Sequence, residues 1–138
     1  MDEATEAALV AAAVAAREQS YAPYSGFSVG AAVLDGEGRI HAGCNVENAA
    51  YPQGQCAEAT AIGAMVTAGG RLIKAVAVAG PDTGPEDPFC TPCGGCRQRL
   101  REFASGALTV IICQPRGIVA RHTLASLLPE SFGPDHLD

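Results

Sequence analysis

Basic residues are scarce in this 138-residue sequence: Lys and Arg together number nine, against fifteen Asp and Glu, and the formal net charge is −6. Proteins that hold a nucleic-acid backbone present clustered Lys and Arg, so this balance argues against RNA or DNA as a partner. We expect instead a small substrate with little negative charge. Charged residues make up only 17% of the chain, and together with many alanines this suggests that another subunit covers part of the surface.

Long uninterrupted apolar runs are also missing. The longest one near the start, residues 7–16, is preceded by acids and ended by Arg17 and Glu18. It lacks the basic leader of a signal peptide and the length of a membrane span, so we expect no membrane partner and a cytoplasmic protein. Without repeats or low-complexity linkers, the length suits a single domain, residues 1–138, with its own hydrophobic core.

Apolar periodicity and turn residues predict alternating helices and strands. Helices are expected at residues 2–19, 56–68, 93–104 and, as a short one, 124–128. Strands are expected at residues 27–34, 39–46, 73–79 and 108–113, with a further short one at 117–121. Asp35 and Gly36 begin a hairpin turn between the first two strands. This order indicates an α/β fold with a mixed sheet of about five strands and helices on both faces.

Three of the six cysteines fall into two clusters, each at the start of an expected helix: Cys56 stands alone, and Cys93 forms a C-x-x-C pair with Cys96. Helix N-termini lower thiol pKa values and tolerate clustered negative charge. Three thiolates are one ligand short of a closed tetrahedral zinc site, which leaves a position for water. Glu58, two residues after Cys56, is placed to move protons at that water.

Other interpretations of the cysteines remain open. Cys90 could complete a structural zinc knot, as in a non-enzymatic module that binds protein. It precedes Cys93 by only three residues, however, and joins the same tetrahedron poorly if Cys93 begins a helix. A redox pair of Cys93 and Cys96 is disfavoured because a proline-rich loop, rather than a strand, precedes it.

The order Cys-x-Glu followed by Pro-Cys-x-x-Cys is the signature of zinc-dependent nucleoside and nucleobase deaminases, in the variant where Cys replaces the first His. More specifically, the chain resembles the small homotetrameric cytidine deaminases of the cytidine/deoxycytidylate deaminase superfamily. The resemblance runs from about Tyr21 to the C-terminus, and its motifs occur in the expected order. The matching segments are residues 27–32, 43–49, 56–58, 92–98 and 127–134.

This resemblance implies a cytidine-deaminase-like three-layer sandwich with one Zn²⁺ per subunit, held by Cys56, Cys93 and Cys96. It further implies hydrolytic deamination of cytidine and 2′-deoxycytidine to uridine and 2′-deoxyuridine with release of ammonia, as in pyrimidine salvage. Glu58 would be the proton shuttle beside the zinc-activated water. A blasticidin-type aminonucleoside deaminase shares the zinc motifs, but residues 45–49 favour an ordinary ribose.

The resemblance also implies where a nucleoside binds. Asn45 and Glu47 match residues that bind ribose hydroxyls, and Phe27 matches an aromatic that packs on the pyrimidine. Residues 49–51 and Phe132 match segments that reach a neighbouring subunit's active site, which implies a homotetramer with shared sites. The full set of expected substrate contacts is Phe27, Asn45, Val46, Glu47, Asn48, Ala49, Ala50, Tyr51, Ala57 and Phe132.

One position departs from the family pattern. Many members carry Arg directly after the catalytic Glu, where it offsets the charge of the thiolates, but here that residue is Ala59. We therefore expect the helix N-termini and Arg97 to provide the compensation.

Overall fold

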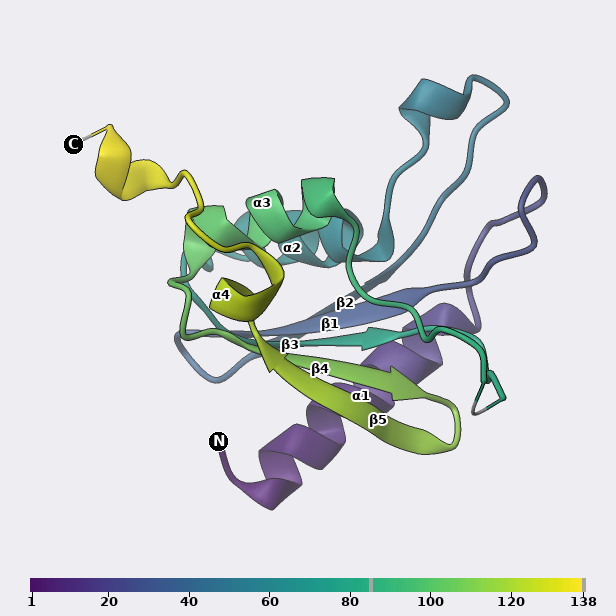
Figure 1. The fold of residues 1–138 in the computed structure, drawn as a ribbon, viewed down its shortest axis with the longest axis horizontal. Helices are drawn as coiled ribbons and strands as arrows, with labels where there is room; N and C mark the ends of the chain where they lie inside the picture. Colours follow the sequence, from purple (N-terminus) through teal and green to yellow (C-terminus); the bar gives the residue numbers. More distant parts are fainter. Residues whose placement is uncertain (85, 138) are drawn as a thin grey trace.

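A mixed sheet of five strands occupies the middle of the computed structural model, which describes residues 1–84 and 86–137 (Figure 1). The strand order is β2-β1-β3-β4-β5, and only the pair β3 and β4 is parallel. The expected mixed sheet of about five strands is confirmed. The strands are β1 (Gly30–Asp35), β2 (Ile40–Cys44), β3 (Ile73–Ala79), β4 (Thr109–Gln114) and β5 (Gly117–Thr123).

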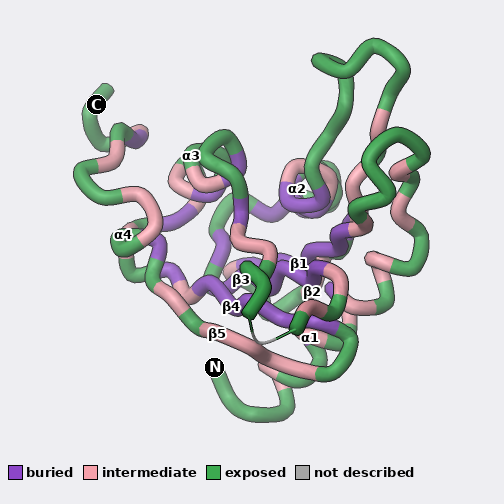
Figure 2. Tube along the Cα trace, turned by 45° about the vertical axis from the view of Figure 1, so that its right-hand side comes forward, coloured by how far each residue is buried: buried purple, intermediate pink, exposed green. Residues whose placement is uncertain are grey.

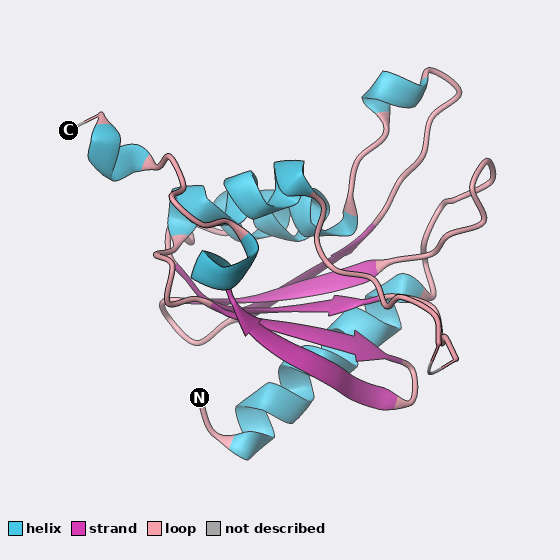
Figure 3. Cartoon of the chain, in the orientation of Figure 1, coloured by secondary structure: helices cyan, strands magenta, loops and turns pink. Residues whose placement is uncertain are grey.

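Helices cover both faces of this sheet (Figure 3). On one side lies α1 (Glu3–Arg17), and on the other lie α2 (Ala57–Thr67), α3 (Gly94–Phe103) and the short α4 (Leu124–Leu127). The three-layer α/β architecture is therefore confirmed. Two short 3₁₀ turns, η1 (Tyr51–Gln53) and η2 (Pro134–His136), lie in a loop and in the C-terminal tail. Among the described residues, no helix is long and apolar enough to cross a membrane.

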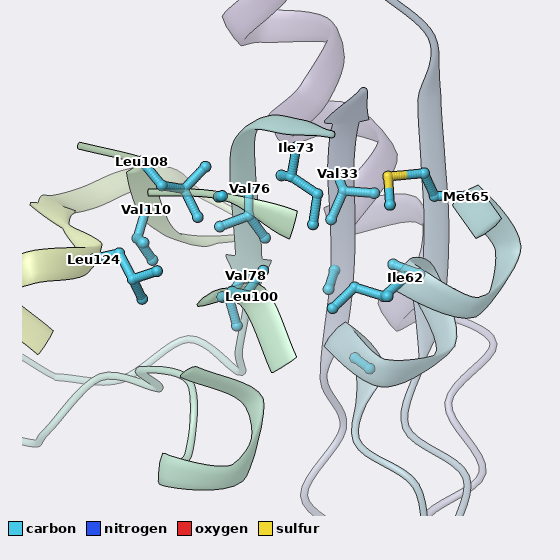
Figure 4. Packing of buried hydrophobic residues seen from close by; sticks show 14 of the residues in the cluster. Val33, Ile62, Met65, Ile73, Val76, Val78, Leu100, Leu108, Val110 and Leu124 are labelled. Atoms are coloured by element: carbon cyan, nitrogen blue, oxygen red, sulfur yellow. The ribbon is translucent and has the colours of Figure 1, made fainter. Parts of the chain in front are cut away.

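The sheet separates two apolar clusters of different character. Toward α2 and α3, branched side chains such as Val76, Val78 and Leu100 form the larger cluster (Figure 4). Toward α1, the strands present mainly alanines, among them Ala75 and Ala77. Because successive strand residues point to opposite faces, β3 supplies both clusters and is buried along almost its whole length (Figure 2).

Two glycines let the helices lie directly on the strands. A Cβ on Gly30 would lie 2.1 Å from the carbonyl oxygen of Ala13 in α1. A Cβ on Gly43 would lie 2.6 Å from the amide nitrogen of Ala61 in α2. Any side chain at either position would push a helix away, so these contacts fix where α1 and α2 sit on the sheet.

The expected limits of the first two strands were wrong by a few residues. The ladder between them begins at Gly30 rather than Phe27 and ends at Cys44 rather than Val46. The physical reason is Asn45, whose side chain bonds to the backbone on the opposite side of the ladder: it accepts from the Val29 amide and donates to the Phe27 carbonyl. These bonds replace the regular ladder, and the two chains then diverge into loops.

Asp35, at the end of β1, is a fully buried carboxylate that organises the β1–β2 hairpin. Its Oδ1 accepts from the amides of Glu37 and Arg39, and its Oδ2 lies 2.9 Å from Arg39 Nε and 2.8 Å from His41 Nε2. Burial alone would raise the pKa of Asp35, but the hydrogen bonds from His41 and the two amides, with the charge of Arg39, hold it well below its usual value. The hairpin is thus stabilised by an ionised side chain.

We expect Asp35→Asn to destabilise the protein at neutral pH and to flatten its loss of stability in acid. Because the folded-state pKa is depressed, the contribution of Asp35 is complete above the unfolded pKa of about 4 and is lost as pH falls below it. Thermal unfolding followed by circular dichroism between pH 3 and pH 7 measures this slope. The exposed Asp82→Asn serves as control, and an unchanged acid slope in Asp35→Asn would contradict the assignment.

Candidate active site

The cysteine clusters occupy the starts of two helices that pack on the same face of the sheet. Cys56 and Cys93 are the N-cap residues of α2 and α3, each with extended backbone angles, and Cys96 lies in the first turn of α3. The N-termini of α2 and α3 are brought to the same end of this helical layer, beside the loop that enters β1 and the loop that leaves β2 (Figure 1). The expected placement of both clusters at helix N-termini is confirmed.

The three sulfur atoms are close enough to share one ion. The Sγ atoms of Cys56, Cys93 and Cys96 all lie within 4.8 Å of one another, and those of Cys56 and Cys93 are 3.8 Å apart. A tetrahedral zinc site with Zn–S bonds of about 2.3 Å has S···S edges of about 3.8 Å. Cys90 does not belong to this cluster. The donor set therefore fits a three-thiolate zinc site rather than a four-cysteine knot.

The thiols differ in how easily they ionise. Burial, followed by the charge of Cys93, raises the pKa of Cys56, and burial chiefly raises that of Cys96. Burial also opposes ionisation of Cys93, but hydrogen bonds from the Cys96 amide and from the thiols of Cys96 and Cys56 lower its pKa overall. Burial raises the pKa of Cys90 to about 11, and the negative charges of Glu58, Cys56 and Cys93 add to this effect. Cys90 is thus held as a neutral thiol beside the cluster.

Glu58 is a nearly buried carboxyl group in the first turn of α2, with only 4% of its surface exposed. Burial raises its pKa, and the positive charge of Arg99 works in the opposite direction. A carboxyl group whose pKa is shifted upward takes up and releases protons closer to neutral pH, which suits general acid–base work.

A cavity of about 390 Å³ lies between the thiol cluster and two loops, the one before β1 and the one after β2. Phe27, Asn45 and Glu47 come from these loops, and Ala57 comes from the first turn of α2. Cys96 lies buried outside this lining. The members of the expected site that line the cavity are Phe27, Asn45, Glu47, Cys56, Ala57, Glu58 and Cys93.

Asn45 is held in one orientation with a single donor to spare. Its Oδ1 accepts from the Val29 amide and the Ser20 hydroxyl, and its Nδ2 donates to the Phe27 carbonyl over 2.8 Å. If the side-chain amide were flipped, its Nδ2 donor would face the N–H donor of Val29 and no hydrogen bond could form. The orientation of the Asn45 amide is therefore fixed. One of its two Nδ2–H groups remains for a ligand.

Glu47 is fixed by the loop before Phe27. Its Oε1 accepts from the amides of Tyr24 and Ser25, and its Oε2 accepts from the Ser25 hydroxyl. These hydrogen bonds lower the pKa of Glu47, the bond from the Ser25 hydroxyl most of all, so the carboxylate stays charged. Asn45 and Glu47 together thus offer one donor and one acceptor at the cavity wall, as a sugar hydroxyl requires.

The remaining expected contacts lie away from this cavity within a single chain. The loop after Asn45 carries Val46, Asn48, Ala49, Ala50 and Tyr51 away from the sheet, and all of them are exposed (Figure 2). Asn48 and Tyr51 line an adjoining cavity of about 320 Å³ that also contains Glu47.

Phe132 lies in the C-terminal tail beside α3, where Gln98 donates to its carbonyl oxygen and His136 stacks on its ring. It is 56% exposed and does not line the cavity that contains Glu58. The structure of one chain therefore does not bring Phe132 to the expected site.

The structure corrects the expected role of Arg97. Its Nε donates to the Pro92 carbonyl over 2.6 Å and its Nη1 to the Leu127 carbonyl over 2.7 Å, so it fastens the loop before α3 to α4. A guanidinium that does contact the thiol cluster belongs to Arg99, whose Nη1 lies 4.0 Å from Cys96 Sγ. Spacing alone could have suggested this, because Arg99 follows Cys96 by three residues and i, i+3 side chains are neighbours on a helix.

Sequence reasoning also missed two hydroxyl-bearing residues of the cavity wall. Ser25 lines the cavity and fixes Glu47, and Thr91 lies in the wall directly before Pro92. Neither carries a local signal, since a Ser or Thr in a proline-containing loop is ordinary turn composition. Only the folding of distant loops onto α2 and α3 brings them to the site.

Comparison with known proteins agrees with this geometry. Residues 3–113 match the family model described as the cytidine and deoxycytidylate deaminase zinc-binding region. A cytidine deaminase of Sporosarcina psychrophila is 44% identical over 129 residues, which cover 94% of this chain and 92% of the relative. A cytidine deaminase of Mycobacterium tuberculosis is 42% identical over 119 residues, 86% of this chain and 82% of the relative.

Solved structures lead to the same family. A crystal structure of cytidine deaminase from Burkholderia pseudomallei superposes with a TM-score of 0.83 at 42% identity, covering 96% of this chain and all of that one. One from Mycobacterium leprae gives a TM-score of 0.74, also at 42% identity, over 91% of this chain and 98% of that one. The family model, the relatives, the fold and the three-thiol cluster agree, and this chain belongs to the cytidine and deoxycytidylate deaminases with a zinc-binding region.

Proposed function

We propose that this protein is a zinc-dependent hydrolase that deaminates cytidine and 2′-deoxycytidine to uridine and 2′-deoxyuridine with release of ammonia, a reaction of pyrimidine salvage. The observation that carries the proposal is a single cavity containing Cys56, Cys93 and Glu58 together with Asn45 and Glu47. Metal ligands and a proton carrier thus share a space with groups suited to a sugar hydroxyl. Relatives at 44% and 42% identity bear the name cytidine deaminase.

One Zn²⁺ per subunit is held by Cys56, Cys93 and Cys96, and when bound it supplies Lewis-acid activation of the attacking water. Glu58 performs the proton transfers. Its carboxyl group gives a proton to N3 of the cytosine ring as C4 is attacked, so charge does not build up on the ring. It then takes up the proton of the hydroxyl group now on C4 and passes it to the amino group, so that the C4–N bond breaks, ammonia leaves and C4 becomes the carbonyl of uridine. Burial supports both steps, because it keeps a proton on this carboxyl group more readily than on an exposed one.

The other half of the cavity orients the nucleoside. The spare Nδ2–H of Asn45 donates to the oxygen of a ribose hydroxyl, and the free lone pair of Glu47 Oε2 accepts a ribose O–H. The Phe27 ring, 45% exposed, packs on the pyrimidine. The Ala57 amide, one of the first N–H groups of α2, has no partner within the helix and is available to the carbonyl oxygen of the base. A blasticidin-type substrate would use the same zinc and Glu58 but not this sugar contact.

Assembly completes the site in this proposal. Tyr51 is 74% exposed and Phe132 56% exposed, and such aromatic surface is typical of an interface. A homotetramer would let the 46–51 loop and Phe132 of one subunit meet the cavity of another. We further propose that residues 1–138 act as one domain and that the enzyme works in the cytoplasm, where its six free thiols stay reduced.

Cys96→Ala should abolish stoichiometric zinc binding, whereas Cys90→Ala should retain one zinc per chain. The reason is that Cys96 belongs to the thiol cluster and Cys90 does not. Elemental analysis of the purified variants measures the zinc content directly. Loss of zinc from Cys90→Ala would indicate that Cys90 is a fourth ligand of a structural site, and would count against an open metal centre.

Glu58→Gln should keep the fold and the zinc but reduce kcat for cytidine by about 10³-fold, within the range that general acid–base groups contribute. The amide preserves the shape of the buried side chain yet cannot transfer the protons. Loss of the ultraviolet absorbance of cytosine follows the reaction, with cytidine, deoxycytidine, free cytosine and blasticidin S as parallel substrates. Near-normal turnover in Glu58→Gln, or preference for blasticidin S, would refute the proposal.

Shared sites predict complementation between two defective variants. Glu58→Gln and Phe132→Ala tetramers should each be impaired, but co-expression should create sites with Glu58 from one subunit and Phe132 from another. Random mixing in a closed tetramer makes about one quarter of all sites intact. Deamination rates and light scattering of the mixture measure this. A rate equal to the mean of the two parents would show that each subunit builds its own site.

A further inference from the structure

The zinc site carries an excess of negative charge that its ligands cannot remove. Three thiolates and Zn²⁺ together leave one net negative charge, and Glu58 adds another whenever it is ionised. The starts of α2 and α3 each contribute only a partial positive charge of about 0.5. A full cation close to the thiols would therefore strengthen zinc binding.

Among the described residues, Arg99 is the cation with a recorded hydrogen bond to a sulfur of the cluster. It follows Cys96 by one turn of α3, and its Nη1 is 4.0 Å from Cys96 Sγ. A Cβ built on Gly95 would lie 3.1 Å from Arg99 Nη1 and 3.9 Å from Cys93 Sγ, so the guanidinium lies beside the backbone that joins the two ligands of α3. Its charge also reaches Glu58, whose pKa it lowers against the effect of burial.

The neighbouring cations of α3 are engaged elsewhere. Arg97 donates to the carbonyls of Pro92 and Leu127, and Arg101 binds Ser131 and Asp135 in the C-terminal tail. Among the described residues, the salt bridges do not include Arg99, and its recorded hydrogen bond goes to a ligand sulfur. Its guanidinium is thus free to act on the metal centre.

We propose that Arg99 is a positioning residue that neutralises the zinc–thiolate charge from α3, and so provides at this site the cation that Ala59 does not provide from α2. Neutralisation tightens zinc binding and keeps the bound zinc electron-poor, which favours activation of water. The inference rests on the proposed function only in taking zinc as the metal. Its main test measures zinc affinity and does not require that the enzyme turn over a substrate.

Arg99→Gln tests the role of the charge, with Lys74→Gln as the matched control. Both substitutions remove one positive charge, but Lys74 is an exposed residue of β3 outside the site cavity. Competition with a chromophoric chelator measures zinc affinity. We expect Arg99→Gln to bind zinc about tenfold more weakly, as other residues that contact metal ligands do when replaced, and Lys74→Gln to match the wild type.

The zinc-saturated enzyme provides a second measurement. Arg99→Gln should lower kcat for cytidine while KM stays within about twofold, because Arg99 touches a metal ligand and not the substrate-binding residues. Melting curves with zinc present check that the fold is intact. If cytidine is not a substrate but zinc affinity falls as expected, the proposed function fails and the role of Arg99 stands.

Two variants that restore charge complete the test. Arg99→Lys keeps a cation on α3, and Ala59→Arg combined with Arg99→Gln supplies one from α2. Recovery of zinc affinity in either variant supports charge compensation. The proposal would be overturned if Arg99→Gln bound zinc as tightly as the wild type, or if Lys74→Gln lost as much zinc affinity as Arg99→Gln. It would also be overturned if neither of the two restored variants recovered zinc affinity.

Discussion

Three thiols can share one metal ion here because two helices begin at the same place. Cys56 and Cys93 are N-cap residues of helices that pack side by side, and this brings ligands 37 positions apart in the chain to an Sγ separation of 3.8 Å. The same arrangement directs the N–H groups of both helices toward clustered negative charge. Shifting either helix by a fraction of a turn would separate the sulfurs, so the chemistry depends on the helical layer keeping its position.

The sheet provides that position. Gly43 allows the backbone of α2 to contact β2 directly, and Gly30 does the same for α1 on β1. Branched residues such as Val78 and Leu100 then fill the space beneath α2 and α3 (Figure 4). The close contact at Gly43 and the dense packing of these branched side chains leave α2 and α3 little freedom to move. This suits a metal centre whose ligands must keep their geometry.

The half of the cavity that contains Asn45 and Glu47 is held in a different way. Asn45 ends the β1–β2 ladder by taking over its hydrogen bonds, and Glu47 is fixed by Ser25 and two amides of the preceding loop. These bonds orient both side chains before any ligand arrives, so less conformational entropy is lost on binding. The loop beyond Glu47 leaves the body of the chain and exposes Tyr51, the surface that the proposed tetramer would bring to another subunit.

The sequence by itself determined the order of helices and strands, the mixed sheet, and the metal ligands with Glu58 beside them, because periodicity and short motif spacing are local properties. It placed the strand ends a few residues too far out, since the bonds of Asn45 to Val29 and Phe27 join segments distant in the chain. Only the tertiary structure showed the cavity shared by both halves of the site. It also showed that Arg97 donates to the carbonyl of Leu127, 30 residues away in the chain, while Arg99 contacts a ligand thiol.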